Sequence, residues 1–502
     1  MKKTLLSIFS LFPMLIISAQ QDVLWEKSIG GENAEYLYHA ISTPDYGFIL
    51  LGSSGSNFSK NIDNLSEGGL DYFISKLDEN GKQEWQHTFG GSGNDFLYAA
   101  VSTPDGGILL AGSSDSDKGR DKTENSKGLH DYWVIKLDAG KNIQWQKTLG
   151  GTGNDFLRQV IRTHDGGYLL AGESNSGKSF DKSEIGFGGF DYWLIKLDSK
   201  GNIVWEKTIG GNLNEEVKYI QETKNGFILL GNTNSIDETT IQQDNGFDVE
   251  MIILTKKGEV ESRKKIISTQ EDDFLHAVDE KNDHLNLLIS TNENDKSQLV
   301  ILEVDKNGSI HSEIRKELNN KFSINSLFKL ENNDFLIAGS QQGFKKDQNI
   351  IPTSFYTIFS LDINGAENWR KELKESGYND LQFAFQTRDQ SIILIGNSNS
   401  KNTSTSSNQD FRIIKLGNKN SEIKRELVEL YPNPTSDYIN LLIQQGIEPT
   451  TGSVYNLTGQ KLQDFKINSR TTAIDLRNYP SGIYIIQFNV DKQSHSIKVI
   501  KK

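Results

Sequence analysis

The sequence predicts an all-β protein, a seven-bladed β-propeller followed by a small Ig-like β-sandwich. Two observations predict the propeller: tryptophans recur at a fixed interval, and each repeated unit holds four strand-like segments. A third observation predicts the sandwich, because the repeat stops after Leu416 and a different pattern of short strands begins. The chain has 45 glycines and only 8 prolines, a composition that favours short strands and tight turns over long helices.

The repeated unit is about 60 residues long. Its tryptophans are Trp25, Trp85, Trp145 and Trp205, which open the phrases WEKSIGG, WQHTFGG, WQKTLGG and WEKTIGG. Four segments belong to a unit, for example FLYAAVST (a), GILLAGSS (b), DYWVIKLD (c) and NIQWQKTLG (d). Segment c alternates with the period of a strand, and TPDGG between a and b reads as a hairpin turn. A single four-stranded sheet cannot bury both of its faces, but several such sheets stacked around an axis can. The repeat therefore predicts a propeller.

The number of units predicts seven blades closed by the N-terminus. The a–b–c triplets begin near residues 36, 96, 156, 216, 274, 322 and 381, and the d segments begin near residues 22, 82, 142, 202, 259, 309 and 366. The first d segment precedes every triplet and the last triplet lacks one, so residues 22–30 are expected to complete the last blade and leave no free sheet edge. Units five and six are degenerate, which leaves eight blades or a misphased unit open.

The two ends of the chain predict export. Residues 1–20 have a charged start, an apolar run and a small-residue end, which is typical of a signal peptide cleaved near residues 18–21. The apolar run is short for a membrane anchor, and the rest of the chain has no stretch of membrane length, so we expect no transmembrane segment in the mature protein. The chain has no cysteine, which excludes disulfides, thiol nucleophiles and a lipidated N-terminal Cys. Its net charge of −13 argues against nucleic-acid binding.

Residues 429–502 read as a separate domain after a polar linker at 418–428, and residues 21–417 as the propeller. Short strands separated by PNPTSD, LTGQ and YPSG turns predict the small sandwich. The phrases YPNP, VYNLTGQ and IDLRNYPSGIYII and the basic end resemble the C-terminal sorting domain (type A) of the type IX secretion system of Bacteroidetes. The matching motif residues are Tyr431, Pro432, Asn433, Pro434, Gly459, Gln460, Gly482, Tyr484, Lys498, Lys501 and Lys502. The resemblance implies contact with the type IX machinery, passage through the periplasm, and delivery to the cell surface or medium.

Sequence motifs for catalysis are lacking. The eight histidines are scattered without HExxH, no GxSxG occurs, and the GGTGN phrases precede no helix pattern. An acidic residue recurs after each GG phrase, at Glu35, Asp95, Asp155 and Glu215, with Asp273 and Asp380 as expected equivalents. These carboxylates either ring an axial cation site or cap turns. Since nearly every unit has one, we expect capping, and the same reasoning covers the Asp that begins each c segment.

Residues that break the repeat are the better candidates for function. The long b–c loop at 113–130 brings Asp115, Asp117 and Asp121 close in sequence, which makes them weak candidates for calcium, although a solvated loop is the simpler interpretation. Trp133 and Trp193 either offer sugar-stacking faces or pack between blades, and their alternation favours packing. No other cofactor is expected.

The DGG phrases also resemble repeats of exported bacterial propellers without an assigned activity. We therefore expect an exported, non-catalytic binding or display protein, whose extracellular ligand is a glycan or a protein. The alternatives are a propeller-fold enzyme acting on glycans, as a hydrolase or lyase, and a structural component of a surface layer. An enzyme would need non-repeated carboxylates or histidines gathered in the axial channel.

Overall fold

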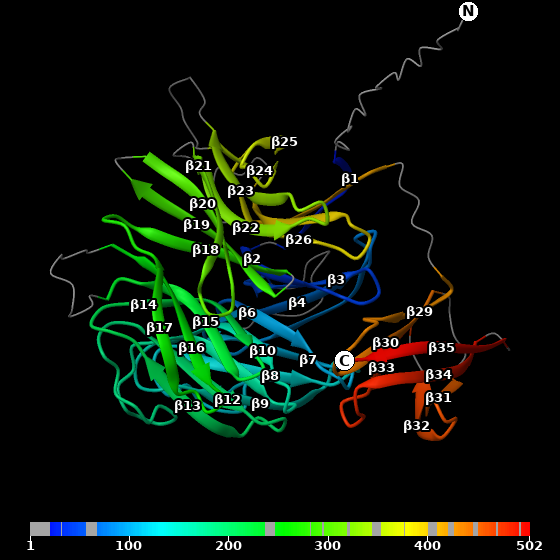
Figure 1. Cartoon of the computed structure of the whole chain (residues 1–502). Coiled ribbons are helices and arrows are strands. Elements are labelled where there is room, and N and C mark those ends of the chain that lie inside the picture. The colour runs from blue at the N-terminus through cyan, green and yellow to red at the C-terminus, as the bar shows by residue number, and fades with distance from the viewer. Residues whose placement is uncertain are drawn as a thin grey trace, which may run out of the picture.

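All regular structure in the computed structural model is β-strand (Figure 1). The structure describes residues 21–31, 33–56, 68–235, 246–281, 283–293, 296–318, 322–343, 353–375, 377–399, 409–419, 426–444, 450–467, 470–490 and 493–502. The expected signal peptide at 1–20 and much of the expected linker lie outside these ranges. Within them, no helix is long and apolar enough to span a membrane.

Seven four-stranded antiparallel sheets form the propeller. Blade 1 holds β2 (Glu35–Ser42), β3 (Phe48–Ser54), β4 (Asp71–Leu77) and β5 (Gln83–Phe89). Blade 2 holds β6 (Asp95–Ser102), β7 (Ile108–Ser114), β8 (Asp131–Leu137) and β9 (Ile143–Leu149). Blade 3 holds β10 (Asp155–Arg162), β11 (Tyr168–Ser174), β12 (Asp191–Leu197) and β13 (Ile203–Ile209). Blade 4 holds β14 (Glu215–Glu222), β15 (Gly226–Thr233), β16 (Asp248–Thr255) and β17 (Val260–Ile267).

The degenerate units are complete blades as well. Blade 5 holds β18 (Asp273–Lys281), β19 (His284–Glu293), β20 (Lys296–Val304) and β21 (Ile310–Glu317). Blade 6 holds β22 (Phe322–Lys329), β23 (Phe335–Gly343), β24 (Thr353–Leu361) and β25 (Glu367–Leu373). Blade 7 holds β26 (Asn379–Gln386), β27 (Ile392–Ser398), β28 (Asp410–Gly417) and, as its outer strand, β1 (Asp22–Ile29).

The ring is closed by its own first strand, as predicted. β1 pairs antiparallel with β28, and this register joins Trp25 to Lys415 and Ile29 to Phe411. The first strands of the blades contact one another in ring order, from β2 through β6, β10, β14, β18 and β22 to β26 and back to β2. These seven strands are therefore the innermost ones, and the outer strands lie at the rim. The prediction of seven blades is confirmed.

Repeated residues hold neighbouring blades together. The b and c strands of blades 1–3 are buried along their whole length, which explains why their sequences are almost continuously apolar. Each repeated tryptophan lies on an outer strand and reaches the next blade: the Trp25 indole donates to the Glu79 carbonyl at 3.2 Å, and that of Trp205 to the Lys256 carbonyl at 3.2 Å. The tryptophans thus have the outer-strand packing role that the sequence predicts.

The C-terminal part is a two-sheet sandwich. One sheet has the order β29 (Val428–Tyr431), β30 (Tyr438–Ile443), β33 (Thr471–Asp475). The other has the order β32 (Lys461–Ile467), β31 (Thr450–Asn456), β34 (Gly482–Val490), β35 (Gln493–Lys501). Both sheets contribute to one apolar core, which includes Ile439, Val454 and Ile486. This core shares no residue with the blade clusters, so the sandwich has its own.

Candidate binding site around the propeller axis

The side chains nearest the propeller axis vary from blade to blade. Inner strands β2, β6, β10 and β14 share one burial pattern, in which the first and third residues are buried and the second and fourth are partly exposed. These partly exposed residues are Tyr36 and Tyr38 in blade 1, Phe96 and Tyr98 in blade 2, Phe156 and Arg158 in blade 3, and Glu216 and Lys218 in blade 4. In blades 5 and 7 they are Phe274 with His276, and Asp380 with Gln382. We call this set the axial residues.

The axial residues of blades 1–3 form a continuous aromatic surface. The rings of Tyr38 and Tyr98 lie 4.9 Å apart across the boundary between two blades, and Phe96 lies 6.1 Å from Tyr98. The Arg158 guanidinium covers the rings of Tyr98 and Phe156, at 5.2 and 5.5 Å. Burial, followed by the neighbouring Tyr98, raises the pKa of the Tyr38 phenol, so this hydroxyl stays neutral and can donate a hydrogen bond.

A buried ion pair lies beside this aromatic surface. Arg158 Nε donates to Glu173 Oε1 at 2.6 Å, and Glu173 is almost completely buried on β11. At the matching place the other blades carry Ser53, Ser113, Asn232, Ser290, Ser340 and Asn397. Burial raises the pKa of the Glu173 carboxyl, and Arg158 opposes the shift. Its second oxygen, Oε2, is buried and has no hydrogen-bond partner among the described residues.

Charged and polar axial residues continue into blades 4 and 5. Lys218 Nζ lies 3.2 Å from Glu216 Oε2, and both side chains keep about a third or more of their surface exposed. The His276 ring is hydrogen-bonded to the Ser290 hydroxyl at 2.7 Å. Burial, with a smaller contribution from Lys218, lowers the pKa of His276 to about 4, so this imidazole is neutral near pH 7. The axial residues therefore change from aromatic to polar around the ring.

Asp380 is an axial residue, and its predicted equivalence to the repeated acids is wrong. Asn379 takes the repeated position, since it is fully buried and pairs with Ser398, whereas Asp380 pairs with Asn397. The Asp380 carboxylate accepts from the Ser340 hydroxyl at 3.2 Å and from the Gln382 amide at 2.5 Å. Burial raises the pKa of Asp380. The offset arises because unit seven has lost its GG phrase and offers no marker for the count.

Long b–c loops bring further rings to the same end of the inner strands. His130, the last residue before β8, lies 5.2 Å from Phe156 and 6.0 Å from Phe96, measured between ring centroids. Phe190 lies 5.8 Å from Phe156, and Phe247 lies 5.1 Å from Phe274. These loops thus extend the aromatic surface on the face where the d–a and b–c connections meet.

The repeated acids cap turns, as predicted. The Asp155 carboxylate accepts from the Gly151 N–H at 2.7 Å and from the Ser176 hydroxyl at 3.0 Å, and Asp95 repeats the pattern with Gly91 and Ser116. Asp273 does the same with the Thr269 N–H at 2.7 Å. Glu35 and Glu215 accept in the same way from the N–H groups of Gly31 and Gly211, so blades 1–5 share this bond, which satisfies an N–H that has no strand partner.

The three calcium candidates do not form a metal site in the structure. Asp115 accepts from the Asn94 N–H, and Asp121 accepts from the Gly90 N–H at 3.1 Å. Lys122, beside them, is buried and donates to Ser114 Oγ at 2.8 Å, so the loop is anchored at this point, whereas residues 117–120 are exposed, as expected of a solvated loop. No group of three or more His, Asp or Glu in the described part of the chain could hold a metal ion. Calcium binding through Asp117 and its neighbours stays a prediction.

Trp133 and Trp193 are fully buried, so they offer no sugar-stacking face and pack between blades as expected. Their indole N–H groups donate to Gln146 at 3.0 Å and to Glu206 at 2.7 Å. The axial residues, which the sequence analysis did not single out, include aromatic side chains that are partly open to solvent. One sequence signal could have identified them. The second and fourth residues of segment a differ from unit to unit, whereas the first and third residues are similar.

The structure brings together the two ends of the sorting motif. The Asn433 side chain accepts from the Ile500 N–H at 2.9 Å and donates to the Lys498 carbonyl at 2.9 Å. Lys501 Nζ donates to the Ser436 carbonyl at 2.8 Å, and the Lys502 N–H donates to the Thr435 carbonyl at 2.8 Å. Pro432 and Pro434 thus lie beside the last strand.

The other motif residues lie apart from this cluster. Gly459 and Gln460 form the β31–β32 turn, where Gly459 has φ of 81°. Gly482 begins β34, and Tyr484 on that strand is buried in the sandwich core, where its hydroxyl donates to the Pro480 carbonyl at 2.6 Å.

Residues 429–502 match the family model of the secretion system C-terminal sorting domain. The prediction of a type IX sorting domain at the C-terminus is therefore confirmed. No curated protein matches the chain.

Several solved structures resemble the chain weakly. A fungal alcohol oxidase of the AA5 family, in complex with copper, aligns with a TM-score of 0.46 and 11% identity over 96% of this chain and 99% of that chain. The β-propeller domain of the Trilobed protease from Pyrococcus furiosus gives 0.41 and 9% over 78% and 96%, and a polysaccharide lyase gives 0.39 and 12% over 77% and 89%. Such low scores carry no argument about function.

Proposed function

We propose that this protein is an exported, non-catalytic propeller that binds an extracellular glycan at its axial residues. Its type IX sorting domain supports secretion, to the cell surface or the medium. The observation that carries the proposal is the variation of the axial residues, because fold stability alone asks for the same residue in every blade. Binding sites are commonly built from partly exposed aromatic and charged side chains of this kind.

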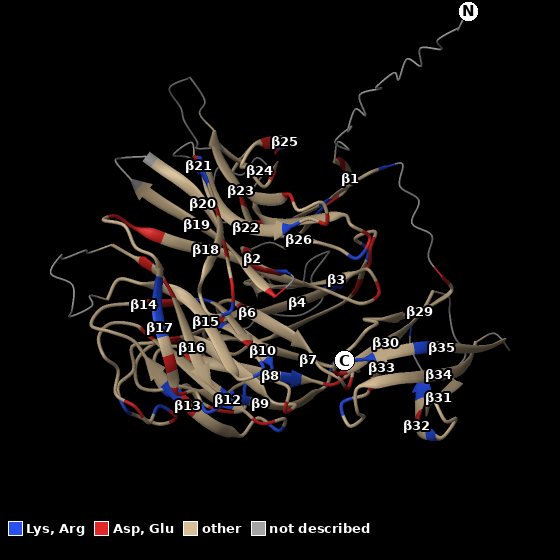
Figure 2. Ribbon diagram, in the orientation of Figure 1, with Lys and Arg blue, Asp and Glu red and all other residues tan. Residues whose placement is uncertain are grey.

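A glycan fits the chemistry of these residues. The rings of Tyr38, Tyr98 and Phe96 offer apolar faces to sugar C–H groups, while the nearby charged groups of Glu216 and Lys218 can bond hydroxyls or carboxylates. In the view of Figure 2, charges of both signs are interspersed over the propeller and the sandwich.

Binding to a panel of soluble polysaccharides by titration calorimetry tests the proposal. We expect at least one glycan to bind, and Tyr98→Ala and Lys218→Ala to weaken it by about tenfold each, the loss of about 1.4 kcal/mol. The matched controls are Tyr455→Ala and Lys466→Ala in the sandwich. Equal affinities in all four variants, or no binding by the intact protein, would contradict a glycan site at the axis.

A secreted glycan hydrolase or lyase is the second candidate. The observation in its favour is Glu173, a buried non-repeated carboxyl whose pKa burial raises and whose Oε2 has no partner among the described residues. If the protein degrades the bound glycan, reducing ends or unsaturated products accumulate, and Glu173→Gln abolishes them without weakening binding. If no product accumulates over a long incubation with the bound glycan, the enzyme candidate fails.

A further inference from the structure

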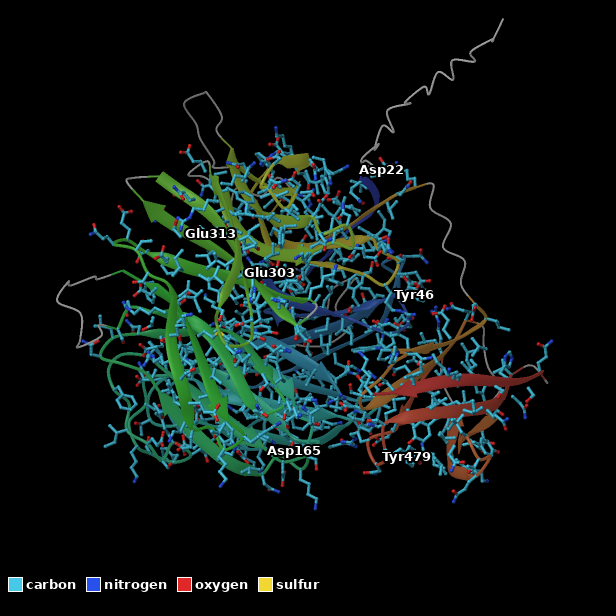
Figure 3. The ribbon with its side chains drawn as sticks, in the orientation of Figure 1. Asp22, Tyr46, Asp165, Glu303, Glu313 and Tyr479 are labelled. Carbon is cyan, nitrogen blue, oxygen red and sulfur yellow. The ribbon has the colours of Figure 1, made fainter. Side chains whose placement is uncertain are left out.

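The face of the propeller opposite the long loops contacts the sorting domain. The contacts come from the a–b side of blades 1, 3 and 7, and from β29 and the segment that leads into β30 of the sandwich (Figure 1). Tyr46 is labelled in Figure 3 at the edge of the propeller nearest the sandwich. Two arginines of the propeller carry most of the described polar contacts.

The first anchor is Arg388, in the turn between β26 and β27. Its guanidinium donates to Glu429 Oε2 at 2.9 Å and lies 3.9 Å from the ring centroid of Tyr431, the first residue of the YPNP motif. The Tyr46 ring lies 4.3 Å from the same guanidinium, and the Tyr46 hydroxyl donates to Glu429 Oε2 at 2.8 Å. One carboxylate and two rings thus enclose a single arginine.

The second anchor is Arg162, at the end of β10. Its guanidinium donates to Asp437 Oδ2 at 2.8 Å and lies 4.6 Å from the Tyr438 ring centroid. The side chains of both anchors and their carboxylate partners are mostly buried, with exposed fractions of 14–24%. The two anchors therefore use the same chemistry, a carboxylate and a tyrosine ring on one guanidinium.

Each of the three propeller residues replaces a smaller residue of the repeat. Arg162 stands where blades 1 and 2 have Ser42 and Ser102. Arg388 stands where two other turns have Pro44 and Pro104. Arg162 and Arg388 thus place two long charged side chains on the a–b turn face.

Tyr46 is the costliest of these exchanges for the backbone. It has φ of 67° at the turn position that Gly106 and Gly166 fill with φ of 78° and 84°. Asn333 and Gln390 take φ of 69° and 59° at the same turn position in blades 6 and 7, and Tyr46 is the bulkiest of the three. From this turn its hydroxyl reaches the sandwich.

We propose that the a–b turn face of the propeller is a dedicated receptor for the chain's own sorting domain, which holds Tyr431 of the sorting motif in one pose during export. The receptor consists of Arg162, Arg388 and Tyr46. The sorting domain supplies Glu429, Asp437 and two tyrosine rings.

Spin labels on the full-length mature chain test the docking, because the protein has no cysteine of its own. One spin label is attached at Lys200→Cys in the propeller and one at Lys466→Cys in the sandwich. Pulsed electron paramagnetic resonance then measures the distribution of distances between the two labels. We expect a narrow distance distribution that broadens at least twofold in the pair Arg162→Ala and Arg388→Ala, and also in the pair Glu429→Gln and Asp437→Asn. The matched control pair is Arg315→Ala and Arg370→Ala, remote from the sandwich.

A charge exchange separates docking from misfolding. Arg388→Glu alone is expected to broaden the distribution, and adding Glu429→Arg is expected to narrow it again, while the melting temperature of the propeller stays constant. A broad distribution in the parent chain, or a narrow one in both double variants, would overturn the proposal.

Discussion

The acidic residue that starts the inner strands of blades 1–5 shows how one side chain serves the fold at an electrostatic cost. Glu35 is fully buried, its Oε2 accepts from the Gly31 N–H at 3.1 Å, and its other oxygen accepts from the Ser56 hydroxyl. Burial raises the pKa of Glu35 to about 7, against the opposing hydrogen bonds and with help from the nearby Asp410. The Glu35 carboxyl caps the turn at Gly31 even though its buried environment disfavours the ionised form.

Glu35→Gln is therefore expected to change how stability depends on pH. The folded-state pKa is above the unfolded value of 4.5, so the free energy of unfolding of the native protein falls as pH rises from about 4.5 through about 7. The full effect is on the order of 3 kcal/mol. Denaturant unfolding at pH 5 and pH 8 measures it, and Glu35→Gln should lose this part of the pH dependence.

The control is Glu261→Gln, on the exposed outer strand β17. This variant should keep the native pH dependence. If Glu35→Gln keeps it too, the raised pKa of Glu35 is not the cause.

At the level of the element, the GG phrase that follows β1, β5, β9 and β13 is set by close packing with the start of strand c. A methyl group on Gly150 would lie 1.7 Å from Asp131 Oδ1, and one on Gly210 would lie 1.8 Å from Asp191 Oδ1. The phrase recurs because each outer strand passes over the first carboxylate of its own strand c.

Gly150→Ala is expected to destabilise the protein by about 1–3 kcal/mol, because Asp131 must move away from its bond to the Lys127 N–H, 2.6 Å long. Chemical denaturation of the purified variant measures the loss. Gly177→Ala is the matched control, since nothing lies within 4 Å of an added methyl group there. Equal stability of the two variants would contradict this account of the GG phrase.

The elements that were predictable are those that repeat. Trp145, Gly150 and Asp155 each serve a packing or turn requirement that every blade shares, and recurrence in the sequence exposes that requirement. The place of Tyr98 and Arg158 beside the axis could not be predicted in the same way. It depends on how the seven blades close into a ring, which the sequence of one strand does not show.

The same limit applies to the alignment of degenerate units and to contacts between the propeller and the sandwich. Asp380 was aligned with the repeated acids, whereas Asn379 is their equivalent, because no GG phrase marks the start of β26. The contact of Arg388 with Glu429 joins residues whose neighbourhood depends on how the sandwich sits against the propeller, and no local pattern encodes that.

At the scale of the whole molecule, the propeller depends on one strand that is far in sequence from its sheet. β1 covers the outer edge of β28, and Glu26 forms a 2.7 Å ion pair with Arg412, which is otherwise almost fully buried. Trp25 and Ile29 also pack into the apolar cluster shared by blades 7 and 1. The N-terminal strand thus joins the last blade to the first.

Deleting residues 22–30 is expected to destabilise the whole ring rather than one blade. The deletion exposes the edge of β28, removes one of the two ion-pair partners of Arg412 and opens the cluster that contains Ile29. We expect the melting temperature of the propeller to fall by about 10 °C or more in scanning calorimetry, since each kcal/mol lost shifts the transition of a large domain by a few degrees. Deleting residues 493–502, which removes β35 from the sandwich, should leave the propeller transition in place, and an unchanged propeller transition after loss of β1 would refute closure by the N-terminal strand.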